Sequence, residues 1–195
     1  WSATTPIMPD VVSYTTVMVG FARAAEPKRA VEVLRMMEEA DVKPNVLSYT
    51  AVVDGFAAAG QVEQAATWLK RARAAGVAPN VVTYSAVAKG YASVGRLTEA
   101  QAVLAEMEED GVLPSPITFN ALISCCVRAR KTAQAMALLE QACGMGVVPS
   151  LPSFNMLIGA LVRDGEHGSA EAVLQRMGQL VLQPDTVTFA SLMDP

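Results

Sequence analysis

The sequence predicts an all-α protein, an α-solenoid superhelix in which helix-turn-helix repeats of 35 residues stack on one another. The first observation is a phrase of proline, a small polar residue, two apolar residues, a hydroxyl and an aromatic. It returns at a constant spacing behind Pro9, Pro44, Pro79, Pro114, Pro149 and Pro184. The second observation is a pair of helical apolar stripes in each interval. Because one short hairpin cannot bury its stripes alone, neighbouring units must share a core.

Counting from Val11 divides the chain into five complete frames, 11–45, 46–80, 81–115, 116–150 and 151–185. Residues 1–10 are expected to end a preceding partial repeat. Residues 186–195 are expected to begin a further one. We therefore expect this chain to be a piece of a longer array.

The first half of each frame is predicted to be one helix and the second half another. Apolar residues at i, i+3, i+4 and i+7 mark one face of a helix. In the third frame this spacing is shared by Tyr84, Val87, Ala88 and Tyr91, and again by Ala100, Val103, Leu104 and Met107. Small residues one period apart should allow the helices to approach closely, at Ala30, Ala65, Ala100, Ala135 and Ala170.

Residues suited to helix ends punctuate the frames. Hydroxyls near the start of each first helix are expected to satisfy its free amides, at Ser13, Ser48, Thr83, Thr118, Ser153 and Thr188. Pro27 stands where a second helix would begin. Gly76, Gly111 and Gly146 follow the second helices, as a left-handed residue after a helix should. Asp41 and Val181 replace this glycine, so we expect those two exits to turn less tightly.

Composition excludes several classes of protein. No stretch reaches the roughly 18 uninterrupted apolar residues of a membrane span. The three cysteines lack the paired spacing of a zinc site, and their odd number argues against a disulfide framework. The one histidine, His167, has no nucleophile near it in the sequence. We expect neither catalysis nor a cofactor or metal.

The phrase Val-Val-Ser/Thr-Tyr, followed along each frame by Gly, Ala, Leu, Met and Gly-Val-x-Pro, resembles the pentatricopeptide repeat family in its pure 35-residue form. The resemblance covers residues 9–195. It implies that the first helices line a concave groove for single-stranded RNA, with one base read per repeat. It also implies a role in stabilising, processing or translating a transcript in a mitochondrion or chloroplast.

The resemblance further implies which residues select bases, namely the fifth and the last residue of each frame. The fifth residues are Thr15, Thr50, Ser85, Asn120 and Asn155. The last residues are Asn45, Asn80, Ser115, Ser150 and Asp185. All are short and polar, and hydroxyls and amides present different hydrogen-bonding groups to a base. A role in caps and turns is the alternative, and it is strongest for the last residues, each of which directly follows a proline.

By the same resemblance, Thr with Asn favours adenine, Asn with Ser cytosine and Asn with Asp uracil. The uncommon pair Ser85–Ser115 carries a weak purine preference. The implied target is 5′-A-A-purine-C-U-3′, with the chain parallel to the RNA. The second residue of the frame is implied to wedge the bases apart, at Val12, Leu47, Val82, Ile117 and Val187, with Pro152 as the departure.

The charge is unusual for a nucleic-acid-binding protein, because the net charge is −4 and the pI is near 5.0. Taken together, the first halves of the frames nevertheless contain more basic than acidic side chains. One register of the frame is occupied by Arg23, Arg128 and Arg163, and the resemblance implies a basic side chain facing phosphate there. Ala58 and Ser93 interrupt this series. The acidic balance leaves a second hypothesis open. The same solenoid could be a scaffold subunit that contacts protein subunits of a larger assembly.

Overall fold

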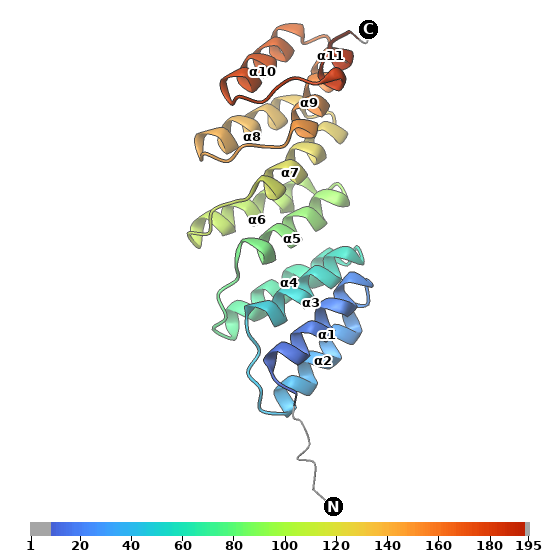
Figure 1. Ribbon diagram of the computed structural model, residues 1–195, viewed down its shortest axis with the longest axis vertical. Helices are drawn as coiled ribbons and strands as arrows, with labels where there is room; N and C mark the ends of the chain where they lie inside the picture. Colours follow the sequence, from blue (N-terminus) through green and yellow to red (C-terminus); the bar gives the residue numbers. More distant parts are fainter. Residues whose placement is uncertain (1–8, 194–195) are drawn as a thin grey trace, which may run out of the picture. The chain divides into compact units, whose positions relative to one another are not determined.

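The structure, a computed structural model, describes residues 9–193. This part of the chain is all helical, which confirms the predicted class (Figure 1). Residues 1–8 of the predicted partial repeat 1–10 and residues 194–195 of the partial repeat 186–195 lie outside it. The helices are α1 (Val11–Arg23), α2 (Pro27–Glu39), α3 (Val46–Ala58), α4 (Val62–Ala74), α5 (Val81–Ser93), α6 (Leu97–Glu109), α7 (Pro116–Arg128), α8 (Thr132–Gly144), α9 (Leu151–Arg163), α10 (His167–Gln179) and α11 (Thr186–Met193).

The chain divides into two compact units, Trp1–Gly90 and Tyr91–Pro195, and the division falls inside α5. In the first unit α1 packs on α2 and on α3, and α3 packs on α4. In the second unit α7 packs on α8 and α9, and α9 packs on α10 and α11. The first helices α1, α7 and α9 therefore each contact their own hairpin partner and the first helix of the next hairpin.

The predicted stripes form the core of each unit. Phe154, Leu157, Ile158 and Leu161 on α9 are each 0% exposed. The alanines one period apart on the second helices are also fully covered, between 0% and 1% exposed, at Ala30, Ala65, Ala100, Ala135 and Ala170. A methyl group at these positions lets two helix backbones come close, which confirms the prediction for the alanines.

A second small-residue position lies at the tenth residue of the frame. A Cβ added to Gly55 would lie 3.2 Å from the Cα of Ala22, and one added to Gly90 would lie 3.3 Å from the Cβ of Ala57. By contrast, no atom outside its own turn lies within 4 Å of such a Cβ at Gly20. The three glycines share a register, yet only two of them are required by close packing between first helices and their neighbours.

This difference predicts opposite effects for one substitution. Gly20→Ala should stabilise the chain by about 0.5–1 kcal/mol, because alanine forms helix better than glycine. Gly55→Ala should destabilise it by about 1 kcal/mol, because overpacking against a backbone exceeds that gain. Urea unfolding followed by circular dichroism measures both. Equal stability of the two variants would show that the contact at Gly55 yields without strain.

The exits of the second helices differ from the expectation. Gly76, Gly111 and Gly146 have φ of 73°, 70° and 73°, as predicted for a left-handed residue. Asp41 and Val181 adopt the same conformation, with φ of 56° and 59°. Their amides also make the same closing bonds, from Val181 N–H to the Gly178 carbonyl and from Leu182 N–H to the Met177 carbonyl in the last frame. The prediction of a looser turn at these two exits was wrong, because the bond pattern fixes the turn whatever the side chain.

Candidate nucleic-acid interface

The last residue of each frame is the N-cap of the first helix that follows it. Asn45 Oδ1 accepts from the Leu47 and Ser48 amides at 3.0 and 3.1 Å. Asn80 Oδ1 accepts from the Val82 and Thr83 amides at the same distances. The capping prediction is confirmed in part: the Ser48 and Thr188 hydroxyls accept from the N-cap amides of Asn45 and Asp185 at 3.3 and 3.1 Å. The amides within the helix are instead capped by the last residue of the preceding frame, as by Asn45 and Asn80. The reason is that only a residue in extended conformation just before the helix can reach these amides.

The fifth residue of each frame lies one turn into the first helix and is mostly covered. Thr15, Thr50, Ser85 and Asn155 are between 7% and 9% exposed, and Asn120 is half-buried. A polar side chain at such a depth needs a hydrogen-bond partner. The partners of these residues decide whether they are simple packing groups or parts of a site.

Two of the predicted pairs are joined directly. Asn155 Nδ2 donates to Asp185 Oδ1 at 3.0 Å. Asn120 Oδ1 accepts from the backbone amide of Ser150 at 2.9 Å. The partners are 30 residues apart in each case. The packing of one first helix on the next brings together the fifth residue of a frame and the last residue of the same frame.

The remaining pairs differ. Thr50 and Asn80 are linked through Thr83, whose hydroxyl lies 2.6 Å from Thr50 Oγ1 and 3.1 Å from Asn80 Oδ1. The Thr15 hydroxyl instead donates to the carbonyl of Val11 at 2.8 Å, so no bond of Thr15 leads to Asn45. The pair Ser85–Ser115 is divided between the two units. Ser85 is buried on α5, and Ser115 caps α7 by accepting from the Thr118 amide.

The predicted wedges form a separate, exposed series. Apolar side chains of this size are usually covered, so their shared exposure at one register is informative. Their exposed fractions lie between 55% and 67%, at Val12, Leu47, Val82, Ile117 and Val187. Pro152, the departure from the series, is exposed as well.

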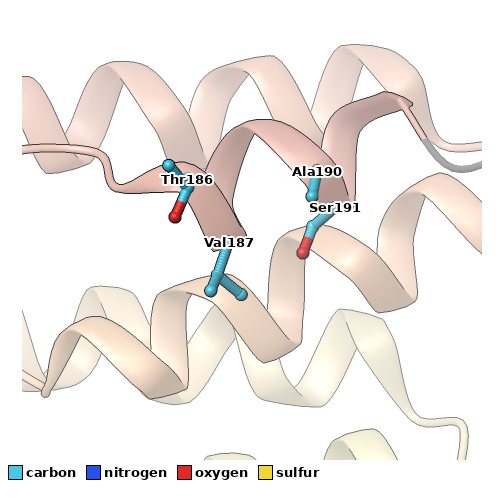
Figure 2. A pocket seen from close by; sticks show the side chains of 4 residues that line it. All are labelled: Thr186, Val187, Ala190 and Ser191. Carbon is cyan, nitrogen blue, oxygen red and sulfur yellow. The ribbon is translucent and has the colours of Figure 1, made fainter.

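A shallow hollow on α11 shows how the second and fifth residues share one face. Figure 2 shows the four side chains that line it, from Thr186, Val187, Ala190 and Ser191. These are the first, second, fifth and sixth residues after Asp185. Val187, at the wedge position, and Ala190, at the selecting position, therefore border the same hollow. On α11 the second and fifth residues after Asp185 therefore lie on one face.

The three register-matched arginines are all exposed. Arg128 is nevertheless engaged within the second unit. Its Nη2 donates to the Ala92 carbonyl at 2.6 Å, and its Nη1 donates to Ser124 Oγ at 2.8 Å. The guanidinium thus caps the carboxyl end of α5, a favourable place for a cation. Arg23 and Arg163 stand in the last turns of α1 and α9.

Electrostatics keep the acidic caps charged. The Thr188 amide is the largest cause that lowers the pKa of Asp185, since it donates to the carboxylate at 2.8 Å. The Ser13 amide and hydroxyl lower the pKa of Asp10 in the same way. Burial raises the pKa of the Cys126 thiol to about 11, so its reactive thiolate is scarce at neutral pH.

Within residues 9–193, no cluster of His, Cys, Asp and Glu is arranged to hold a metal ion. No helix there has the length and apolar character to span a membrane.

A model of the pentatricopeptide repeat-containing proteins matches residues 14–142, and a pentatricopeptide repeat domain model matches residues 137–194. The chain belongs to the pentatricopeptide repeat family. No match was found among curated proteins. The resemblance noted in the sequence is therefore confirmed over most of its length.

Solved structures of pentatricopeptide repeat proteins confirm the solenoid fold class. PPR10 from maize in complex with an 18-nt psaJ RNA element is 30% identical, with a TM-score of 0.71, over 94% of this chain and 27% of that chain. PPR10 without that element matches with 27% identity over 96% of this chain. The chain thus spans about a quarter of the length of PPR10. The repeat domain of Arabidopsis thaliana protein-only RNase P 1, in complex with tRNA, shares the fold at 15% identity and a TM-score of 0.77.

The sequence prediction did not assign the third residue of the frame to the site. Thr83, Ser153 and Thr188 each bond to the fifth residue of the preceding frame, at 2.6, 2.9 and 2.6 Å. A hydroxyl recurs at this register in every frame, and that periodicity was the available signal. It was interpreted as capping alone, because a contact between frames does not follow from sequence spacing.

Proposed function

We propose that this chain binds single-stranded RNA, and that each repeat selects one base through the fifth and last residues of its frame. The observation that carries the proposal is the recurring link between these two residues beside an exposed apolar wedge. It occurs directly in Asn155–Asp185 and Asn120–Ser150, and through Thr83 in Thr50–Asn80. The binding of an RNA element by the similar maize protein supports the same ligand class.

The proposed register runs parallel to the RNA, with one frame per base. Thr15–Asn45 and Thr50–Asn80 would each select adenine, and Ser85–Ser115 a purine. Asn120–Ser150 would select cytosine and Asn155–Asp185 uracil, giving the core A-A-purine-C-U. Val12, Leu47, Val82, Ile117 and Val187 would separate the bases, because exposed apolar side chains can pack on base faces.

Phosphate contacts would be few. Arg23 and Arg163 are exposed in register, whereas Arg128 would have to exchange its bond to the Ala92 carbonyl for one to RNA. With about three to five phosphates engaged, log K should fall with log salt at a slope of about −2 to −3.5. Affinity would therefore be modest and selectivity would come from the bases.

In the cell the bound chain would act by occupying its transcript. Covering RNA blocks nucleases and prevents local pairing, so the transcript is stabilised, processed or translated. We propose a mitochondrion or chloroplast as the location, which is what the family resemblance implies. The repeats would bind their transcript and not catalyse.

Binding to a labelled oligonucleotide containing AAACU tests the proposal. At low salt this RNA should bind at least about tenfold more tightly than a scrambled RNA of the same composition, because two or more selecting pairs lose their bases in the scramble. Fluorescence anisotropy measures both, and a salt titration gives the slope. Equal affinity for the two RNAs would reject sequence selection.

A second candidate function is a scaffold contact through the second helices. Tyr49, half-buried Trp68 and Arg71 border a hollow between α2 and α4, and Arg71 lies 4.5 Å from the Trp68 ring. Tyrosine, tryptophan and arginine dominate protein interfaces. An association with a fixed protein partner that survives RNase and is lost in Arg71→Glu would support this function.

A further inference from the structure

We infer that the third-residue hydroxyl of Thr83, Ser153 or Thr188 is a positioning residue for the reading pair of the preceding frame. It fixes which member of that pair donates a hydrogen bond to the base and which accepts one. The inference rests on the proposed function, since it concerns how the same site tells bases apart. It adds Thr83, Ser153 and Thr188 to the selecting machinery.

The arrangement recurs in both units. Each of these hydroxyls contacts the fifth residue 33 positions earlier: Thr83 with Thr50, Ser153 with Asn120 and Thr188 with Asn155. Thr83, Ser153 and Thr188 are 1%, 4% and 0% exposed, so water does not compete for these bonds. A covered hydroxyl beside an amide oxygen can donate its one proton to it, because that oxygen can only accept, and this bond orders the neighbouring hydrogen bonds.

The proton order of the Thr50–Asn80 pair can be traced atom by atom. Asn80 Oδ1 accepts from the Val82 and Thr83 amides, which leaves both N–H bonds of Asn80 Nδ2 directed away from the helix end. The Thr83 hydroxyl donates to the same oxygen at 3.1 Å, because an amide oxygen can only accept. In the 2.6 Å contact between the two threonines, Thr50 must then be the donor.

This order leaves a definite pattern for a base. Thr50 Oγ1 keeps free lone pairs and is an acceptor, and Asn80 Nδ2 is a donor. The Watson–Crick edge of adenine presents an amino donor at N6 and an acceptor at N1. Thr50 Oγ1 can therefore accept from the adenine N6 amino group while Asn80 Nδ2 donates to N1. Uracil presents its N–H and carbonyls in the opposite order.

The Asn155–Asp185 pair has the reverse pattern. The Thr188 hydroxyl lies 2.6 Å from Asn155 Oδ1 and 2.9 Å from Asp185 Oδ1, and we assign its one proton to the shorter contact, with Asn155. One N–H of Asn155 Nδ2 is donated to Asp185 Oδ1, which also accepts from the Thr188 amide at 2.8 Å. What remains is the second N–H of Asn155 and the Oδ2 of Asp185. A donor next to an acceptor matches a carbonyl and the N3–H of uracil.

The Asn120–Ser150 pair follows the same rule. Asn120 Oδ1 accepts from the Ser150 amide and from the Ser153 hydroxyl, both at 2.9 Å. Its Nδ2 is thereby turned outward as a donor, which suits the N3 and O2 acceptors of cytosine. Without the third-residue hydroxyl, a carboxamide of this kind could rotate and present its oxygen instead.

Two substitutions that remove the hydroxyl at nearly constant shape test the inference, and each controls for the other. In the 195-residue chain, Thr83→Val should reduce the preference for adenine over uracil at the second base about fivefold to tenfold. It should leave the preference at the fifth base unchanged. Thr188→Val should reduce the preference for uracil over adenine at the fifth base and leave the preference at the second base unchanged. Thr83→Ser and Thr188→Ser keep the hydroxyl and should keep both preferences. The probes are AAACU, AUACU and AAACA oligonucleotides, and helical circular dichroism checks folding.

The outcomes separate a positioning role from a structural one. A valine variant that binds all three RNAs more weakly by one common factor, with its preference intact, overturns the inference and leaves the proposed function standing. An unsubstituted chain without preference at either base overturns the proposed function and the inference together. If a valine variant does not fold, Ser153→Ala removes only an oxygen and applies the same measurement to cytosine at the fourth base. An unchanged cytosine preference there would overturn the inference.

Discussion

Asn155→Thr combined with Asp185→Asn is expected to change the preferred fifth base from uracil to adenine. The double variant reproduces, around Thr188, the side chains that Thr50 and Asn80 have around Thr83. Each matched base is worth about tenfold over the mismatched one, so the uracil-to-adenine ratio should change about 100-fold in total. Anisotropy titrations with AAACU and AAACA oligonucleotides give this ratio directly.

The double variant should fold as the parent does. Asparagine caps a helix as well as aspartate, so α11 keeps its N-cap. The variant also removes one negative charge, which strengthens binding to any RNA. Asp10→Asn is the matched control, because it changes the same residue type at the N-cap of α1, outside the five predicted reading pairs. The control should raise affinity for both RNAs and leave their ratio unchanged. A double variant that still prefers uracil would show that the assigned register is wrong.

Val181→Gly is expected to stabilise the chain by about 1 kcal/mol. The φ of Val181 is 59°, a conformation that costs an L-residue about 1–2 kcal/mol and is least suited to a β-branched one. The side chain is 82% exposed, so its removal loses little packing. Glycine removes the strain, and its greater freedom in the unfolded chain offsets part of the gain.

The equivalent exit of the preceding frame provides the opposite experiment. Gly146 has a φ of 73°, and a Cβ there would meet no atom within 4 Å. Gly146→Val should therefore destabilise by about 1–2 kcal/mol through backbone strain alone. Thermal and urea unfolding of the two variants should place them on opposite sides of the parent. If both left stability unchanged, the left-handed turn would carry no strain at these exits.

The sequence predicted the hairpins and their core because local rules determine them. Tyr84 with Val87, or Phe154 with Leu157, needs only the helical period to be assigned to a buried stripe, and each residue is 0% exposed. The left-handed glycines that follow the second helices could also be predicted, since Gly76 needs no distant contact for this conformation. The prediction of a looser turn at Val181 was wrong because backbone hydrogen bonds, and not the side chain, determine that turn.

The site was only half determined by the sequence. The family resemblance named Asn155 and Asp185 as a pair, and it also named the second residues of the frames as wedges. Only the packing of α9 on α11 decided that Thr188 bonds through its hydroxyl to Asn155 and through its amide to Asp185. The physical reason is that periodicity fixes where a residue lies on its own helix. The proton order of a buried hydroxyl depends on side chains 30 or 33 residues away, and those meet only when the helices pack.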